Sequence, residues 1–219
     1  PRGLGLVTDW AVTPDPGGVN LWYYGPSELE ARTPGGGKLV IVQETGYPLE
    51  GEIRITLRLD KPERFSLRLR IPRWSEKTRV ANGDTAIFPK AGAVCELFEH
   101  WQDGSTVRLS LDMRVHCLIG KEDMRGRISL YRGPLLLAYD RAFNEPFLDE
   151  IGKLVSLDLV PAAGLPFCVI PPLCAFRAHT DRGDILLTDF ITAGMNGMQY
   201  QTYLPFDDAL TVNARQAMA

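Results

Sequence analysis

Alternation of apolar and polar residues is the sequence feature that most constrains the fold of this chain. Residues 53–59, 65–71 and 107–113 alternate between the two kinds one residue at a time. A β-strand with this pattern buries one face and exposes the other, whereas a helix would scatter both kinds around its axis. These segments therefore predict strands of sheets that pack against a second layer.

Glycine and proline separate the apolar segments rather than interrupting them. Asn82-Gly83 and Asp103-Gly104 are typical of hairpin turns, because Asn, Asp and Gly tolerate positive φ angles. The segments expected to form strands are residues 19–24, 39–44, 51–59, 65–71, 78–81, 85–88, 93–99, 106–113, 127–131, 135–139, 155–159, 174–179, 184–188 and 200–204. Only residues 143–152 and 207–219 have plausible helical patterns.

Strands at roughly 8–12-residue intervals are typical of β-sandwiches. The sequence therefore predicts an all-β chain of two consecutive antiparallel β-sandwich domains, with jelly-roll-like connections. The charged stretch at residues 120–126 is the best candidate for the boundary. We expect residues 17–122 to form the first β-sandwich and residues 123–219 the second.

Charge and hydropathy exclude two classes of partner. The net charge is -3, with 24 basic against 27 acidic residues, so we expect neither nucleic-acid nor membrane-surface binding. No apolar run approaches the roughly 20 residues that cross a bilayer. The first residues lack the pattern of a signal peptide. The chain does not begin with Met, so localisation signals would lie outside it, and a cytoplasmic location is the expectation.

The cysteines and histidines give no metal or catalytic pattern. Four cysteines, at positions 95, 117, 168 and 174, match neither a zinc motif nor a dense disulfide framework, and we expect them to be reduced and packed. A bridge between Cys168 and Cys174 is the alternative. The three histidines end predicted strands without a matched nucleophile. Carboxylate pairs such as Glu96 and Glu99 are expected on opposite faces or in loops. We therefore assign no catalytic residue and no metal ligand.

Aromatic residues suggest a binding surface. In a strand over residues 19–24, Trp22 and Tyr24 would share one face, and Leu21 and Tyr23 the other. Such a pair could stack on a sugar ring, and Trp74 is a further candidate. Packing in a core or at a domain interface is the alternative for all three side chains.

An ordered series of segments is similar to a known family. The segments are residues 20–28 (NLWYYGPSE), 43–48 (QETGYP), 67–74 (LRLRIPRW), 80–83 (VANG), 101–104 (WQDG) and 126–134 (GRISLYRGP). In this order they resemble the region that follows the catalytic barrel in glycoside hydrolase family 127, the β-L-arabinofuranosidase family. Residues 200–205 (YQTYLP) resemble the family's closing strand.

The resemblance implies an (α/α)6 barrel followed by two β-sandwiches. It places the nucleophilic Cys, the acid/base Glu and the zinc ligands in the barrel, and none of them carries over to a position here. It implies that residues 1–16 are a linker left from that barrel, that this chain holds no cofactor, and that its main partner is the barrel.

The function expected is therefore that of a non-catalytic accessory region that supports the barrel. A carbohydrate-binding module, with weak sugar binding, and a protein-interaction β-sandwich are the alternatives. A chain without its barrel would expose a strand edge and an apolar patch, so a homodimer is also expected at high concentration.

Overall fold

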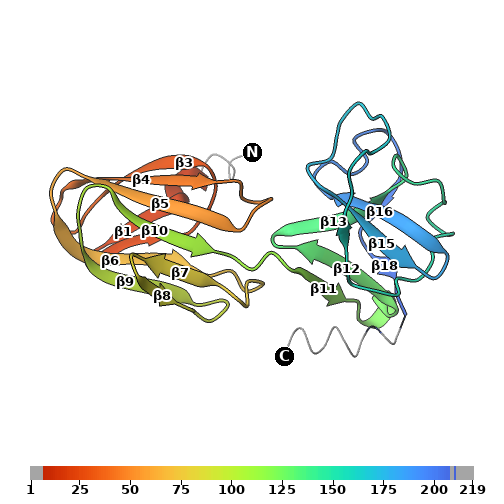
Figure 1. Cartoon of the computed structure of the whole chain (residues 1–219), viewed down its shortest axis with the longest axis horizontal. Coiled ribbons are helices and arrows are strands. Elements are labelled where there is room, and N and C mark those ends of the chain that lie inside the picture. Colours follow the sequence, from red (N-terminus) through yellow and green to blue (C-terminus); the bar gives the residue numbers. More distant parts are fainter. Residues whose placement is uncertain (1–6, 208–209, 211–219) are drawn as a thin grey trace. The chain divides into compact units, whose positions relative to one another are not determined.

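The computed structural model describes residues 7–207 and residue 210 (Figure 1). Contacts divide the chain into two compact units, Pro1–Met113 (unit 1) and Arg114–Ala219 (unit 2). Helices are short throughout the described residues, and none is long and apolar enough to span a membrane.

Unit 1 contains two sheets. The smaller follows the order β1-β2-β6-β9, with β2 and β6 parallel and the other pairs antiparallel. The larger follows the order β3-β4-β5-β10-β7-β8 and is antiparallel throughout. The elements are α2 (Val7–Ala11), β1 (Val12–Asp15), β2 (Gly18–Leu21), β3 (Ser27–Arg32), β4 (Lys38–Thr45), β5 (Glu52–Leu59), β6 (Glu63–Arg70), β7 (Arg79–Asn82), β8 (Thr85–Ile87), β9 (Val94–Trp101) and β10 (Ser105–Ser110).

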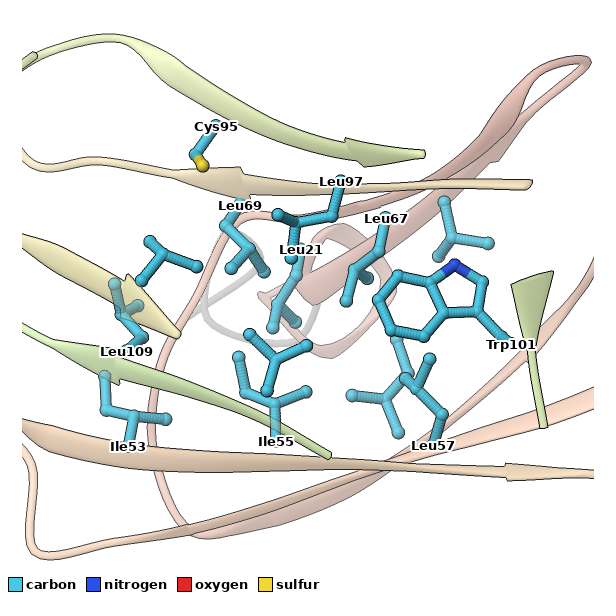
Figure 2. Close-up of a cluster of buried hydrophobic side chains, with 14 of the residues drawn as sticks. Leu21, Ile53, Ile55, Leu57, Leu67, Leu69, Cys95, Leu97, Trp101 and Leu109 are labelled. Carbon is cyan, nitrogen blue, oxygen red and sulfur yellow. The ribbon is translucent and has the colours of Figure 1, made fainter. Parts of the chain in front are cut away.

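The apolar residues of the alternating segments form the core of unit 1, as the sequence predicts. Figure 2 shows leucines of β6 facing isoleucines of β5 across the space between the two sheets. Ile53, Ile55, Leu67 and Leu69 are all completely or almost completely buried. Trp101 closes this core, and its indole Nε1 donates a hydrogen bond of 2.9 Å to the main-chain oxygen of Phe65.

Unit 2 contains one connected set of strands in the order β11-β12-β13-β16-β15-β14, with β17 beside β13 and β18 beside β12. Only two residue pairs join β12 to β13, at Tyr131↔Leu136 and Arg132↔Leu135. Both sides of this junction contribute side chains to one core. The elements are β11 (Val115–Ile119), η1 (Glu122–Met124), β12 (Arg127–Arg132), β13 (Leu135–Asp140), β14 (Val160–Pro161), β15 (Ala175–Thr180), β16 (Gly183–Asp189), β17 (Tyr200–Gln201) and β18 (Leu204–Pro205).

Two buried carboxylates hold the loops of unit 2. Asp140 accepts hydrogen bonds from the main-chain nitrogens of Ala142 (2.8 Å) and Gly194 (2.9 Å). Asp189 accepts from those of Leu173 (2.6 Å) and Thr192 (3.0 Å), among others. Both aspartates are fully buried. Each carboxylate ends a strand and satisfies main-chain donors that no strand partner reaches.

The prediction of an all-β chain with sandwich-like domains is confirmed, with the parallel β2–β6 pair as a local exception. Strands β1, β3, β11 and β14 lie where no strand was predicted. Residues 143–152, a predicted helix, form turns around Pro146, and residues 155–159, a predicted strand, lie outside every strand. Most of the predicted helix at 207–219 lies outside the described residues.

The division into units differs from the expected boundary at 122/123. Strand β11 pairs with β12 along its whole length, and Cys117 lies in the core of unit 2. The charged stretch at 120–126 is thus a connection inside unit 2. Part of the expected linker, residues 12–15, forms β1 and pairs with β2. The many charges of this stretch suggested a domain boundary. In the structure the stretch is a short connection between the paired strands β11 and β12.

Candidate functional site

The aromatic run after β2 does not follow strand alternation, because β2 ends at Leu21. Leu21 is fully buried, Trp22 and Tyr24 are half-buried, and Tyr23 is 42% exposed. Trp22 and Tyr23 consequently line the same surface depression, although alternation placed them on opposite faces.

This depression has a volume of about 480 Å³ and is lined by Trp10, Thr13, Trp22, Tyr23 and Arg70. We name it the aromatic depression. Trp10 comes from α2 and is 49% exposed. Thr13 lies on β1 and Arg70 ends β6. The end of one sheet therefore gathers three aromatic rings, a hydroxyl and a guanidinium around one hollow.

Hydrogen bonds fix Trp22 in place. Its indole Nε1 donates to the Thr13 hydroxyl at 2.8 Å, and its main-chain nitrogen donates to the Ala11 oxygen at 2.9 Å. Its main-chain oxygen accepts a bond of 2.7 Å from Arg70 Nε. Contacts on both the ring and the main chain hold this residue against β1 and β6.

The other two predicted sugar-binding residues lie elsewhere. Tyr24 packs against the core of unit 1, and its hydroxyl donates to the Arg70 main-chain oxygen at 2.7 Å. Its ring meets that of Tyr47 edge-on at 6.4 Å, and burial raises the pKa of both phenols. Trp74 also packs against this core. Of the three candidates, only Trp22 lines the aromatic depression.

Sequence reasoning missed Trp10, Tyr23 and Arg70 for two reasons. Trp10 belongs to the segment expected to be a linker, and Tyr23 and Arg70 were placed by strict alternation. A useful signal would have been the Pro-Gly-Gly sequence at residues 16–18, which lies between Trp10 and the Trp22-Tyr23 pair. It joins β1 to β2 and so brings these aromatic residues together.

A second polar cluster lies on the smaller sheet of unit 1. Arg68 contacts Asp15 at 2.6 Å and Glu96 at 2.9 Å. Hydrogen bonds from Asn20 and from the Gly17 main chain, together with Arg68, lower the pKa of Asp15 to about 2. Hydrogen bonds from Ser66 and Arg68 lower the pKa of Glu96. Both carboxylates are thus held ionised in ion pairs that join β1, β6 and β9.

The described residues contain four free thiols and no cluster of metal-ligating side chains. Within residues 7–207 and 210, no group of three or more His, Cys, Asp or Glu side chains is arranged to hold a metal ion. The four cysteines are free thiols. Burial raises the pKa of Cys95 and Cys117, and burial and Asp189 raise the pKa of Cys174 to about 11. At these three cysteines the thiolate, which is the reactive form, is therefore disfavoured at neutral pH.

The fold and the site together define a pair of β-sandwich units with a surface hollow and no metal cluster among their described residues. Residues 18–113 match the family model for the middle domain of the GH127 β-L-arabinofuranosidases. The resemblance to the β-sandwich region of glycoside hydrolase family 127 is therefore confirmed. No curated protein sequence matches the chain.

Solved structures extend the similarity to both units. One is described as a glycoside hydrolase; it is 26% identical, with a TM-score of 0.82 over 94% of this chain and 38% of its own. A GH127 β-L-arabinofuranosidase from Geobacillus stearothermophilus T6 is 19% identical, with a TM-score of 0.77 over 94% of this chain and 36% of its own.

A third structure, a GH127 β-arabinofuranosidase, is 17% identical, with a TM-score of 0.74 over 91% of this chain and 36% of its own. The chain thus spans less than two fifths of the length of each of these proteins. At 19% and 17% identity, the two named arabinofuranosidases support the fold alone.

Proposed function

We propose that this chain is the non-catalytic accessory region of a GH127-like glycoside hydrolase and that it packs beside an (α/α)6 catalytic barrel. One observation carries the proposal: 94% of the chain superimposes, with a TM-score of 0.82, on 38% of a much longer glycoside hydrolase. The remaining length of such a hydrolase is available for a catalytic region. The middle-domain match over residues 18–113 supports the same assignment for unit 1.

The environment of the acidic residues supports a non-catalytic role. Glycoside hydrolysis uses two carboxyl groups on either side of a bound glycosidic bond, at separations of about 5–10 Å. Asp15 and Glu96 are instead held in ion pairs with Arg68, and Asp140 and Asp189 accept main-chain hydrogen bonds inside unit 2. None of these four carboxylates lines the aromatic depression.

The chain is also proposed to hold no zinc of its own. Zinc sites in proteins need three or four Cys, His or carboxylate ligands in tetrahedral positions. Elemental analysis after dialysis should find well under one equivalent of zinc. A full equivalent of zinc that remains after dialysis would contradict this proposal.

A binding measurement tests the proposed packing. The catalytic region of the 26%-identical glycoside hydrolase, prepared without its β-sandwich part, should associate with this chain and gain thermal stability. Sedimentation velocity should show a 1:1 complex, and unrelated β-sandwich proteins of the same size should produce no shift. Absence of a complex with this region and with the catalytic region of a second GH127 enzyme would contradict packing against a barrel.

A further inference from the structure

We propose that the aromatic depression is a saccharide-binding site, which holds one sugar ring or the end of a short oligosaccharide. The ligand would stack on Trp10, Trp22 and Tyr23 and would hydrogen-bond to Arg70. This inference concerns unit 1 alone and does not depend on the proposed packing against a barrel.

The aromatic side chains supply the apolar part of the site. Sugar rings carry C–H groups on their faces, and these groups pack on the electron-rich faces of aromatic rings. Trp10 and Tyr23 are 49% and 42% exposed, which leaves much of each side chain accessible to a ligand. Trp22 is already fixed by Thr13, Ala11 and Arg70. A residue held in this way loses little conformational entropy when a ligand binds.

Arg70 supplies the polar part. A guanidinium has five N–H donors, and within the described part of the chain Arg70 uses one of them, at Nε, in its bond to the Trp22 main-chain oxygen. Among residues 7–207 and 210, no hydrogen-bond or ion-pair partner is found for its two terminal nitrogens. These nitrogens can therefore donate to vicinal hydroxyls or to the carboxylate of a uronic acid.

The size of the hollow favours a small ligand over a protein. Its volume of about 480 Å³ lies within the range of about 300–1,000 Å³ for small-molecule pockets. A stable protein contact buries roughly 800 Å² on each partner, which needs a much larger surface than five lining residues provide. The mixture of aromatic walls with few polar groups is the composition expected of such pockets.

Titration of the whole chain tests the proposal. The probes are linear arabino-oligosaccharide, xylo-oligosaccharide and oligogalacturonate, followed by isothermal calorimetry and by tryptophan fluorescence. We expect saturable binding of at least one probe, with a Kd of about 1 mM. Tyr23→Ala and Trp10→Ala should each weaken binding about tenfold. Arg70→Lys should weaken it as well, most strongly for oligogalacturonate if a carboxylate is the partner of Arg70.

Tyr203→Ala is the matched control, because Tyr203 has an exposure of 44%, close to that of Tyr23, and lies in unit 2. It should leave the Kd unchanged, and circular dichroism should show that all variants keep the parent's thermal midpoint. Three outcomes would overturn the proposal: no saturable binding of any probe, binding that persists in the Trp10→Ala/Tyr23→Ala double variant, or equal weakening by Tyr203→Ala. Loss of barrel association in these variants without loss of sugar binding would instead identify a protein contact.

Discussion

Units 1 and 2 are both built of β-strands, yet they hold those strands together in different ways. Unit 1 relies on long strands: β4, β5, β6 and β9 each contain eight residues. In unit 2 the longest strand, β16, has seven residues, and β14, β17 and β18 have two each. Unit 1 therefore owes its order mainly to sheet pairing and core burial, whereas unit 2 depends more on side chains that bond to loops.

The polar side chains of unit 2 show this difference. Asn144 bridges two segments, because its amide nitrogen donates to the Asp140 and Leu186 oxygens and its oxygen accepts from the Leu186 nitrogen. Asn196 likewise pairs with both main-chain groups of Ile170. The loops held in this way expose large apolar side chains, among them Phe167, which is 97% exposed. Buried polar groups with defined partners can thus replace sheet pairing in ordering a chain.

All four tryptophans, Trp10, Trp22, Trp74 and Trp101, lie in unit 1. Tryptophan fluorescence therefore reports the unfolding of unit 1 alone, while the amide resonances in NMR spectra report both units. This separation allows each of the following predictions to be assigned to one unit.

The largest effect is expected in the core of unit 1. Leu109 is fully buried, and Leu109→Asp would place an unpaired carboxylate among apolar side chains at a cost of at least about 4 kcal/mol. The tryptophan transition in urea should be lost or shifted to very low denaturant. The neighbouring Arg108→Asp is the control, because residue 108 is exposed and lies opposite Arg54 in β5. Equal damage from both variants would show that the register of β10 is wrong.

The next effect is expected in unit 2. Asp189→Ala would leave the main-chain nitrogens of Leu173 and Thr192 without their acceptor, the bond to Thr192 being buried, and should cost about 3 kcal/mol. Amide resonances of unit 2 should be lost at lower urea than in the parent, while the tryptophan transition stays in place. Asp149→Ala, which removes an exposed carboxylate from the same unit, should have no measurable effect. A shift of the tryptophan transition with Asp189→Ala would mean that the two units unfold as one.

A smaller effect is expected from the loss of one side-chain hydrogen bond in unit 2, which resembles a bond in unit 1. Trp101 Nε1 donates to the Phe65 oxygen in unit 1, and the Tyr139 hydroxyl donates to the Pro146 oxygen at 2.5 Å in unit 2. Tyr139→Phe removes only the hydroxyl and should cost about 1–2 kcal/mol. Urea titration followed by NMR measures this loss. A neutral result would indicate that water replaces the lost donor at Pro146.

The smallest effect concerns pH. The pKa of Asp15 is lowered from 3.8 to about 2 in the folded chain, so this residue stabilises unit 1 above about pH 4, and that contribution disappears as the pH falls towards 2. In Asp15→Asn, the thermal midpoint of the tryptophan signal should fall less between pH 4 and pH 2 than in the parent. Parallel pH profiles for the two proteins would show that the Arg68 cluster does not hold Asp15 ionised.

The contrast between the units also explains what the sequence could predict. Alternation over residues 53–59 and 65–71 predicted the core of unit 1, because a long strand repeats its signal several times. It failed at residues 22–24, where β2 has already ended and the main chain turns. The bonds of Asp140, Asn144 and Asp189 join residues up to 54 positions apart, and no local pattern encodes such partners. Of the residues that line the aromatic depression, the sequence identified only Trp22, because segments that are distant along the chain form this surface.

Hydrolysis by the chain itself tests the central proposal most directly. The purified chain, incubated with p-nitrophenyl β-L-arabinofuranoside, should release p-nitrophenol no faster than buffer. Four of its carboxylates are held in ion pairs or main-chain hydrogen bonds, and burial disfavours the thiolate of Cys95, Cys117 and Cys174. Turnover above the buffer rate that a substitution within this chain abolishes would contradict an accessory role and would place an active site in these sandwiches.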